Sequence, residues 1–126
     1  MKRRSNLLTK SNKKTKRNVL LVGAPSAVLE RRAHLLRASG FTVTQAENVC
    51  YAEMFSDQQY FDAAVYDDSL VAEEQMSLAS VMRIRWAWMK LIQFQTHGRP
   101  GNLAGIFDAT VSAESELVAS IQSRLL

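Results

Sequence analysis

The stretch Phe61-Asp62-Ala63-Ala64-Val65-Tyr66-Asp67 decides the fold. Its middle is apolar, as expected for a short strand that is buried on both faces, and two acids, Asp67 and Asp68, stand where the strand should end. In open α/β sheets the carboxyl ends of the strands form the functional crevice. The stretch therefore predicts a central strand that presents a carboxylate at that crevice.

Outward from this strand, segments of strand character alternate with segments of helix character. The other expected strands cover residues 19–22, 41–44, 91–94 and 107–111. The expected helices run from a Ser26 cap to Arg37, from an Asn48 cap over a short stretch, over residues 73–85, and over residues 114–126. Gly40 marks a helix stop, residues 96–102 a loop, and the region near Leu103 a short helical turn. Five strands alternating with about five helices predict an α/β protein with a parallel sheet covered on both faces.

Two of these helices have a predicted inward face. The short helix after Asn48 is expected to turn Cys50, Met54 and Phe55 or their neighbours inward. The last helix is expected to turn Leu117, Val118, Ile121 and Leu125 to one side.

The charge of the chain is divided between a basic start and an acidic body. With 126 residues the chain suffices for one domain, which we place at residues 18–126. Residues 1–17 carry eight basic side chains and no acid, whereas the rest carries eight basic and twelve acidic side chains. Such a basic tail is usually disordered and solvated. The alternative is an arm, residues 2–17, that binds phosphates of nucleic acid or anionic lipid. The absence of aromatic residues among the charges favours the solvated tail.

Several other classes of protein are disfavoured. No apolar run approaches the roughly 18–20 residues of a membrane span. Cys50 is the only cysteine, so no intrachain disulfide forms and a cytoplasmic location is expected. His34 and His97 lack metal-ligand spacing to each other and to Cys50, and His34 is expected to be at least partly exposed. No dinucleotide, phosphate-loop or nucleophile-elbow motif is present, so the chain is not expected to be an enzyme.

The order of several local strings resembles the receiver domain of bacterial two-component response regulators, the CheY-like fold. These strings are Val19 to Val22, Leu35 to Val43, Ala46-Glu47-Asn48, and Asp62 placed five residues before Asp67. The resemblance covers residues 18–126 and implies a flavodoxin-like, doubly wound sheet of five parallel strands in the order 2-1-3-4-5. It also implies that Asp67 occupies the position of the aspartate that accepts a phosphoryl group from a histidine kinase.

Most of the family's other phosphorylation residues are missing. The acidic pair that holds Mg²⁺ after the first strand is replaced by Gly23 and Ala24, neither of which ligates a metal through its side chain. Pro25 follows where a further acid often stands. No lysine follows Lys90, so the lysine of the last strand is absent, and Thr110, Val111 and Ser112 occupy that region. The hydroxyl residue of the fourth strand corresponds to Gln95 or Thr96.

Two interpretations of Asp67 remain open. It is either a phosphoacceptor or an inherited acid that bonds locally, and the missing charge-neutralising groups favour the second. Asp68 is a neighbouring acid that would join Asp67 as a metal ligand, and the two alone would hold Mg²⁺ weakly. We therefore expect no resident metal or cofactor, and Mg²⁺ only if Asp67 is phosphorylated.

The resemblance implies a stand-alone, atypical receiver in phosphorelay signalling that acts by binding a protein. The expected partner is a histidine kinase, another regulator or a second copy of the chain. The alternative is a phosphorylation-independent adaptor that binds nucleic acid through its basic arm. Trp86 and Trp88 either pack between a helix and the fourth strand or mark a partner surface, and their usual burial favours packing.

Overall fold

The computed structural model describes residues 16–95 and 105–125. Its elements follow one another in the order β1 (Asn18–Val22), α2 (Ala27–Ala38), β2 (Thr42–Ala46), α3 (Val49–Gln58), β3 (Ala63–Tyr66), α4 (Ala72–Arg85), β4 (Lys90–Phe94), β5 (Ala109–Val111) and α5 (Glu114–Leu125). The five strands form one parallel sheet in the order β2-β1-β3-β4-β5. The predicted fold class and strand order are confirmed.

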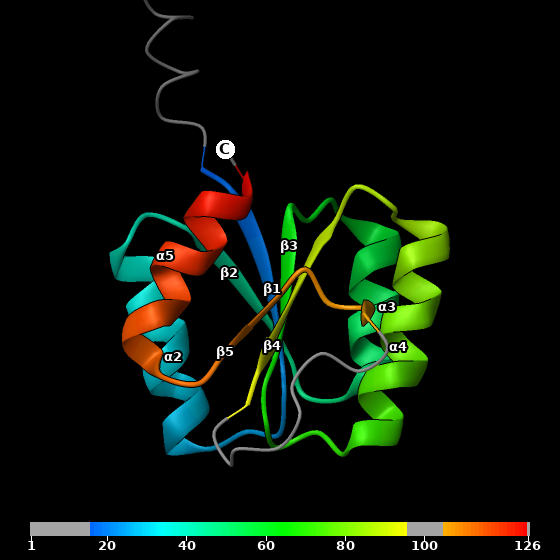
Figure 1. Cartoon of the computed structure of the whole chain (residues 1–126), viewed down its shortest axis with the longest axis horizontal. Helices are drawn as coiled ribbons and strands as arrows, with labels where there is room; N and C mark the ends of the chain where they lie inside the picture. The colour runs from blue at the N-terminus through cyan, green and yellow to red at the C-terminus, as the bar shows by residue number, and fades with distance from the viewer. Residues whose placement is uncertain (1–15, 96–104, 126) are drawn as a thin grey trace, which may run out of the picture.

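Helices cover both faces of the sheet, with α2 and α5 on one side and α3 and α4 on the other (Figure 1). Successive β1 residues serve opposite faces, since Leu20 packs in the core beneath α3 and α4 while Leu21 packs in the core beneath α2 and α5. All four β3 residues are buried. This two-sided burial explains the uninterrupted apolar run in the middle of the central strand.

The predicted helix caps are confirmed. The Ser26 hydroxyl accepts a hydrogen bond from the Leu29 N–H at 3.0 Å, and the Asn48 side chain accepts one from the Tyr51 N–H at 2.9 Å. Gly40 follows α2 with φ of 102°, a left-handed conformation that glycine adopts without steric cost. Local side-chain chemistry therefore sets where these helices begin and end.

The expected inward face of α3 is wrong in detail. Cys50 and Met54 are exposed and Phe55 is only partly buried, whereas Ala52 and Ser56 are the buried residues of this helix. Ala52 and Ser56 are four positions apart and so share one helix face, which the sheet covers. Phe55 borders that face and packs against the core from its side.

Element bounds also differ by a few residues. Strand β2 begins one residue later than expected and continues to Ala46, and β5 begins only at Ala109. Four helices lie within the described ranges, and α5 buries Leu117 and Ile121 while Val118 and Leu125 are partly buried. His34 is exposed, as expected. The predicted loop at residues 96–102, with Thr96 and His97, and the predicted turn near Leu103 lie outside the described residues.

None of the helices in the described ranges combines the length and the apolar character needed to cross a membrane.

Candidate functional site

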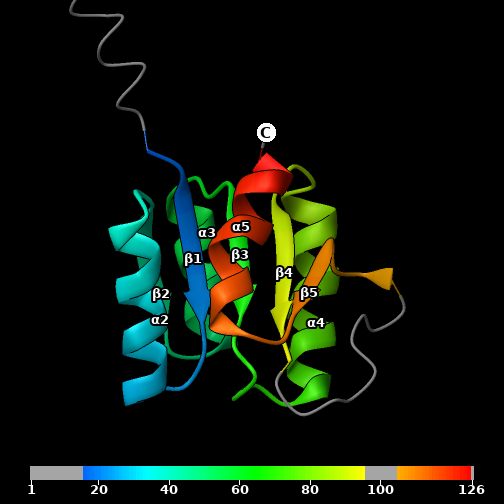
Figure 2. The ribbon, with the colours of Figure 1, turned by 60° about the vertical axis from the view of Figure 1, so that its left-hand side comes forward.

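Asp67 lies at the carboxyl edge of the sheet, directly after β3. Its N–H donates to the Val22 carbonyl oxygen at 2.8 Å, which places Asp67 beside the chain leaving β1. Gly23 and Ala24 begin that segment. They directly follow β1 as Asp67 directly follows β3, and both strands end toward the lower edge of the sheet in Figure 2. This is the edge at which the carboxyl ends of parallel strands gather, as the fold requires.

A residue that the sequence did not single out occupies this site. Arg32, on α2, is only 5% exposed. Its Nη1 donates to Oδ1 of Asp67 and, at 3.2 Å, to Oδ1 of Asp68. Its Nε donates to Oε2 of Glu114, at the start of α5, at 3.1 Å. One guanidinium therefore joins carboxylates from two separate segments, and we call Arg32, Asp67, Asp68 and Glu114 the carboxylate–arginine cluster.

The guanidinium is held from its flat side as well. Its carbon lies 3.7 Å from the centre of the Phe94 ring at the end of β4. A ring face attracts a cation, and the attraction is stronger when water is excluded. The planar guanidinium thus has hydrogen-bond acceptors at its rim and an aromatic ring beneath it, an arrangement that lysine would not reproduce.

Asp67 has both carboxylate oxygens engaged. While Oδ1 accepts from Arg32, Oδ2 accepts from the Ser69 N–H at 3.1 Å. The Ser69 hydroxyl in turn accepts from the Ala24 N–H at 3.1 Å, which ties the turn after β3 to the segment after β1. Asp67 is 3% exposed. The carboxylate is therefore buried and bonded on both sides.

The approach of Asp67 to β1 also dictates glycine at position 23. A Cβ added to Gly23 would lie 2.5 Å from the Asp67 Cβ and 3.1 Å from its Cγ. Real Cβ atoms do not come this close to another carbon, so any larger residue at position 23 would displace Asp67. An acid at this position, as the resemblance would have required, is sterically incompatible with the observed place of Asp67.

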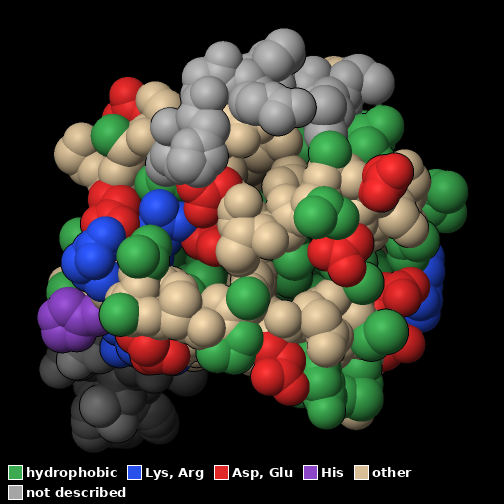
Figure 3. Space-filling model, turned by 90° about the horizontal axis from the view of Figure 1, so that it is seen from below, with side chains coloured by type: hydrophobic (Ala, Val, Ile, Leu, Met, Phe, Trp, Pro, Cys, Tyr) green, Lys and Arg blue, Asp and Glu red, His purple; other side chains and the backbone are tan. Residues whose placement is uncertain are grey.

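The charges of the cluster stabilise one another. Burial lowers the pKa of Arg32, but the charge of Asp67 and the hydrogen bonds to Asp68 and Glu114 raise it by more, so the net direction is upward. The pKa of Glu114 is lowered, chiefly by its hydrogen bond from Arg31, which contacts both carboxylate oxygens at 2.9 and 2.7 Å. Figure 3 views the molecule from this edge and shows basic and acidic side chains side by side on one flank.

The cluster does not suit a magnesium ion. The Asp67 oxygens are taken, and Gly23 and Ala24 offer no side-chain ligand. Among the described residues, no group of three or more His, Cys, Asp or Glu side chains is arranged to hold a metal. Arg32 supplies the positive charge that a cation would bring, so the residues present do not fit the ion.

A second polar network, which the sequence analysis also did not predict, connects β5, β4 and α4 to the turn that follows Asp67. The Thr110 hydroxyl donates to Oε1 of Gln93 at 3.2 Å, and Nε2 of Gln93 donates to Oε1 of Gln75 at 2.8 Å. Nε2 of Gln75 then donates to the Leu70 carbonyl oxygen at 3.0 Å. We call Gln75, Gln93 and Thr110 the glutamine relay. It joins β5, β4 and α4 to the turn that follows Asp67, whereas Gln95 lies partly buried at the end of β4.

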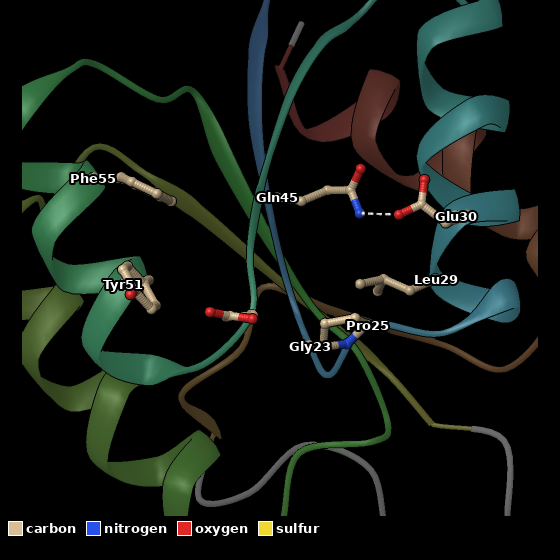
Figure 4. A pocket seen from close by; sticks show the side chains of 8 residues that line it. Gly23, Pro25, Leu29, Glu30, Gln45, Tyr51 and Phe55 are labelled. Atoms are coloured by element: carbon tan, nitrogen blue, oxygen red, sulfur yellow. Dashed lines mark hydrogen bonds between the residues drawn. The ribbon is translucent and has the colours of Figure 1, made fainter.

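A groove of about 400 Å³ opens beside the cluster, between α2 and α3 (Figure 4). Its lining includes Tyr51, Phe55 and Glu47, together with Glu30, which accepts a hydrogen bond from Gln45 at 3.0 Å. Neither Asp67 nor Arg32 lines it. The groove therefore gives no access to the Asp67 carboxylate.

The two tryptophans have different environments. Trp86 is 8% exposed and belongs to the core beneath α3 and α4. Trp88 is 49% exposed, and its Nε1 donates to the Phe61 carbonyl oxygen at 3.1 Å. The preferred interpretation of both as packed residues is confirmed for Trp86 and is wrong for Trp88, which lies in the turn before β4 and is left outside the core.

No known protein family and no curated protein matches the sequence. Solved structures do match. A putative response regulator from Chloroflexus aurantiacus is 19% identical, with a TM-score of 0.78 over 88% of this chain and 98% of that chain. A CheY-like response regulator receiver domain protein from Methanospirillum hungatei is 19% identical, with a TM-score of 0.77 over 88% of this chain and 94% of that chain.

A response regulator protein from Thermotoga maritima in complex with Mg²⁺–BeF is similar to the same extent. It is 20% identical, with a TM-score of 0.75 over 87% of this chain and 99% of that chain. The predicted resemblance is thus confirmed at the level of structure. The chain has the fold of CheY-like response regulator receiver domains.

Proposed function

We propose that this protein is an atypical receiver-like module of two-component signalling that binds a protein partner while Asp67 stays unmodified. The domain would comprise residues 18–126, with residues 1–17 as a separate basic tail. One observation carries the proposal: the Arg32 guanidinium, buried at the carboxyl edge of the sheet, is bonded to both Asp67 and Asp68. A positive charge built into the chain thus takes the place of an external one.

The chemistry of phosphoryl transfer explains why this matters. A carboxylate that attacks a phosphoryl group needs a free oxygen in line with the leaving group and a cation that neutralises the charge of the phosphoryl oxygens. In this chain both Asp67 oxygens accept hydrogen bonds, and the carboxylate is almost wholly buried. Attack would require the loss of a buried ion pair, and removing one partner from such a pair costs about 3–5 kcal/mol.

The cation requirement is equally poorly met. The Thermotoga maritima structure contains Mg²⁺–BeF. In the part of this chain that the structure describes, no group of three or more His, Cys, Asp or Glu side chains is arranged to hold a metal ion. Gly23 is sterically fixed as glycine, so a single substitution would not restore an acid there. Arg32 neutralises the acceptor carboxylate itself, which stabilises its resting state rather than the transition state of an attack on phosphorus.

The glutamine relay supports a fixed binding surface. Receiver switching, as the resemblance implies it, relies on movement near the fourth and fifth strands. Here Gln93 and Gln75 are buried and hydrogen-bonded to each other, and they connect β4 to the turn after Asp67. Moving either amide would leave a buried polar group without its partner. The proposed module therefore presents one conformation to a kinase, another regulator or a second copy of itself.

The proposal is tested by incubating the full chain with acetyl phosphate and Mg²⁺ and measuring its intact mass. We expect no gain of a phosphoryl group in the wild type. Asp67→Asn serves as the control for modification at another residue, and a phosphorylated receiver of the same fold serves as the positive control. A phosphoryl gain in the wild type that disappears in Asp67→Asn would refute the proposal and make Asp67 a working acceptor.

A further inference from the structure

The groove between α2 and α3 crosses the outer strand β2 at its carboxyl end. Figure 4 shows Tyr51 and Phe55 on the α3 side of this groove, Leu29 and Glu30 on the α2 side, and Gln45 on β2 between them. Its volume of about 400 Å³ lies within the range of roughly 300–1,000 Å³ that is typical of ligand sites. Three separate elements thus enclose a site of ligand size, which we call the β2 groove.

The β2 groove is acidic and aromatic. Its described lining residues include two acids, Glu30 and Glu47, and no basic side chain. The rings of Tyr51 and Phe55 have their centroids 5.9 Å apart with an interplanar angle of 31°, and Tyr51 is 40% exposed. Carboxylates attract a cation, and so does the face of an aromatic ring. The groove is therefore complementary to a positively charged ligand that has a flat or apolar body.

The Gln45 side chain holds one of these acids in place. Its Nε2 donates to Oε2 of Glu30 at 3.0 Å, and its Oε1 accepts a hydrogen bond from Nη2 of Arg37 at 3.4 Å. The amide of Gln45 is neutral, so its bond to Glu30 orients the carboxylate without cancelling the charge. A negative charge in a defined position thus forms one wall of the β2 groove.

A guanidinium group suits these walls better than an ammonium group. Its plane stacks on a ring while its N–H groups bind a carboxylate in parallel, and an ammonium group offers neither. Arginines of this chain are held in the same way. The Arg32 guanidinium carbon lies 3.7 Å from the centre of the Phe94 ring, and that of Arg85 lies 4.4 Å from the Trp86 ring. Both of these arginines also pair with carboxylates.

The position of β2 favours a peptide over a free small molecule. β2 is an outer strand of the sheet, and the Gly23 N–H donates to the Ala46 carbonyl oxygen at 3.0 Å. Because successive residues of a strand turn their backbone groups to alternate sides, Gln45 directs its N–H and C=O away from β1. Farther back along β2, the Val43 carbonyl oxygen accepts a hydrogen bond from Arg37 at 3.1 Å, so Arg37 covers the edge there. The carboxyl half of β2, beside the groove, therefore offers backbone groups to an extended partner segment.

We propose that the β2 groove binds an arginine side chain carried by an extended segment of a partner protein. The guanidinium lies between the aromatic side of the groove and the carboxylates of Glu30 and Glu47, and the backbone of the segment bonds to the free edge at Gln45. The inference rests on the proposed function in one respect, since it supposes a protein partner. It uses neither Asp67 nor Arg32, so phosphorylation of Asp67 would refute the proposed function and leave the peptide binding described next unaffected.

The test is a titration of the ¹⁵N-labelled full chain with a blocked pentapeptide that has arginine at its centre and alanine elsewhere. We expect saturable shifts of the Gln45, Glu47 and Tyr51 amide resonances. The same peptide with citrulline, which keeps the shape but loses the charge, should bind at least about 5-fold more weakly. The lysine peptide should bind about 2- to 5-fold more weakly. Free n-propylguanidinium, which lacks the backbone, should bind about 2- to 10-fold more weakly than the arginine peptide.

Matched variants separate the two kinds of contact. Glu30→Gln/Glu47→Gln should weaken binding of the arginine peptide by about 2- to 25-fold, because both ion pairs are lost. Tyr51→Leu should weaken it by about 2- to 5-fold, because the ring face is lost. Two variants outside the groove are controls and should bind as the wild type does. Glu74→Gln removes an exposed acid from α4, and Tyr60→Leu removes an exposed ring before β3.

Three results would overturn the inference. The first is the absence of saturable shifts at the β2 groove, or equal affinity for the arginine and citrulline peptides. The second is an affinity of Glu30→Gln/Glu47→Gln or of Tyr51→Leu equal to that of the wild type. The third is binding of n-propylguanidinium as tight as that of the arginine peptide, which would assign the groove to a free organic cation. All variants retain the basic start of the chain, and urea denaturation verifies that each remains folded.

Discussion

At the scale of single residues, Arg32 is the side chain on which the account depends. A buried guanidinium is tolerated only when its charge and its N–H groups are satisfied, and Asp67, Asp68 and Glu114 satisfy them. The same contacts bury and engage Asp67. We therefore propose that the residue marked by the resemblance as a phosphoacceptor serves as a structural carboxylate in this chain. Its partner Arg32 lies 35 positions away in the sequence.

Removing this cation should be costly. We expect Arg32→Met to lower the free energy of unfolding by about 3–5 kcal/mol, because it leaves carboxylates buried without a counter-charge. Asp67→Asn in the Arg32→Met background should recover part of the loss, and urea denaturation measures both. Arg31→Met is the matched control on the exposed neighbouring position and should cost much less. Equal stability of Arg32→Met and the wild type would show that Arg32 is not buried in the cluster.

Gly23 provides a steric test of the same site. A methyl group at this position would collide with Asp67, so Gly23→Ala should lower the free energy of unfolding by about 1–3 kcal/mol. Ala24→Ser, on the next and exposed position, should change it by less than about 0.5 kcal/mol. Thermal or urea denaturation of the two variants distinguishes them. A Gly23→Ala variant as stable as Ala24→Ser would contradict the close approach of β1 to Asp67.

At the scale of elements, polar side chains connect strands and helices that the hydrophobic pattern alone does not join. The glutamine relay couples α4, β4 and β5, and Glu114 couples the start of α5 to α2 through Arg31 and Arg32. Side-chain hydrogen bonds therefore connect α4 to the strands β4 and β5 on one side of the molecule and α2 to α5 on the other. Such networks specify geometry when all of their members are satisfied.

The glutamine relay makes a prediction about pairs of substitutions. Gln93→Leu should lower the free energy of unfolding by about 1–3 kcal/mol, because the buried Gln75 oxygen loses its donor. Gln75→Leu/Gln93→Leu should be less unstable than the sum of the two single variants, since no unpaired amide remains. Urea denaturation of the three variants completes the cycle. Strict additivity would indicate that the two amides do not interact.

The link between α5 and α2 should depend on pH. The pKa of Glu114 in the folded protein is lowered from its ordinary value of 4.5, so the ionised carboxylate stabilises the fold above this pH. The contribution is lost as the pH falls through the lowered pKa. Glu114→Gln should accordingly be less stable than the wild type at pH 7, and the difference should shrink below pH 4.5. Glu73→Gln, at an exposed position on α4, is the control for the loss of one surface carboxylate.

At the scale of the whole molecule, the two edges of the sheet have different chemistry. The carboxyl edge, which usually receives ligands in this architecture, is closed by an internal ion-pair cluster. The amino edge carries exposed aromatic rings and the attachment of the basic segment. Under the proposed function, a receiver-like fold presents its partner surface without a phosphorylation switch.

Sequence patterns were sufficient to predict the fold because the local signals agreed with the overall alternation of strands and helices. The apolar run before Asp67, the Ser26 and Asn48 caps and the Gly40 stop all reflect local chemistry, and each is found in the structure. The inward face of α3 was misjudged because a helix of ten residues with a small-residue face gives a weak hydrophobic signal.

The site was predictable only in part. The place of Asp67 follows from its strand, but the burial of Arg32 depends on carboxylates that lie far apart in the sequence. Three consecutive charged residues, Glu30 to Arg32, give no indication of which one turns inward. A signal was nevertheless present. Asp67 and Asp68 were expected at a sheet edge without the acidic pair and the lysine of the family, and carboxylates gathered there need a positive charge from another part of the chain. Likewise, Tyr60 and Trp88 are brought together only by the pairing of β3 with β4.

The most direct test of the central claim is NMR of the Arg32 guanidinium in the ¹⁵N-labelled full chain, assigned with Arg32→Lys. We predict an Arg32 Nε–H resonance that exchanges slowly with water, shifts in Asp67→Asn, and is unaffected by millimolar Mg²⁺. An Nε–H that exchanges as fast as that of exposed Arg31, or one displaced by Mg²⁺ together with saturable shifts of the Asp67 and Asp68 amides, would contradict the claim that Arg32 closes the acceptor site.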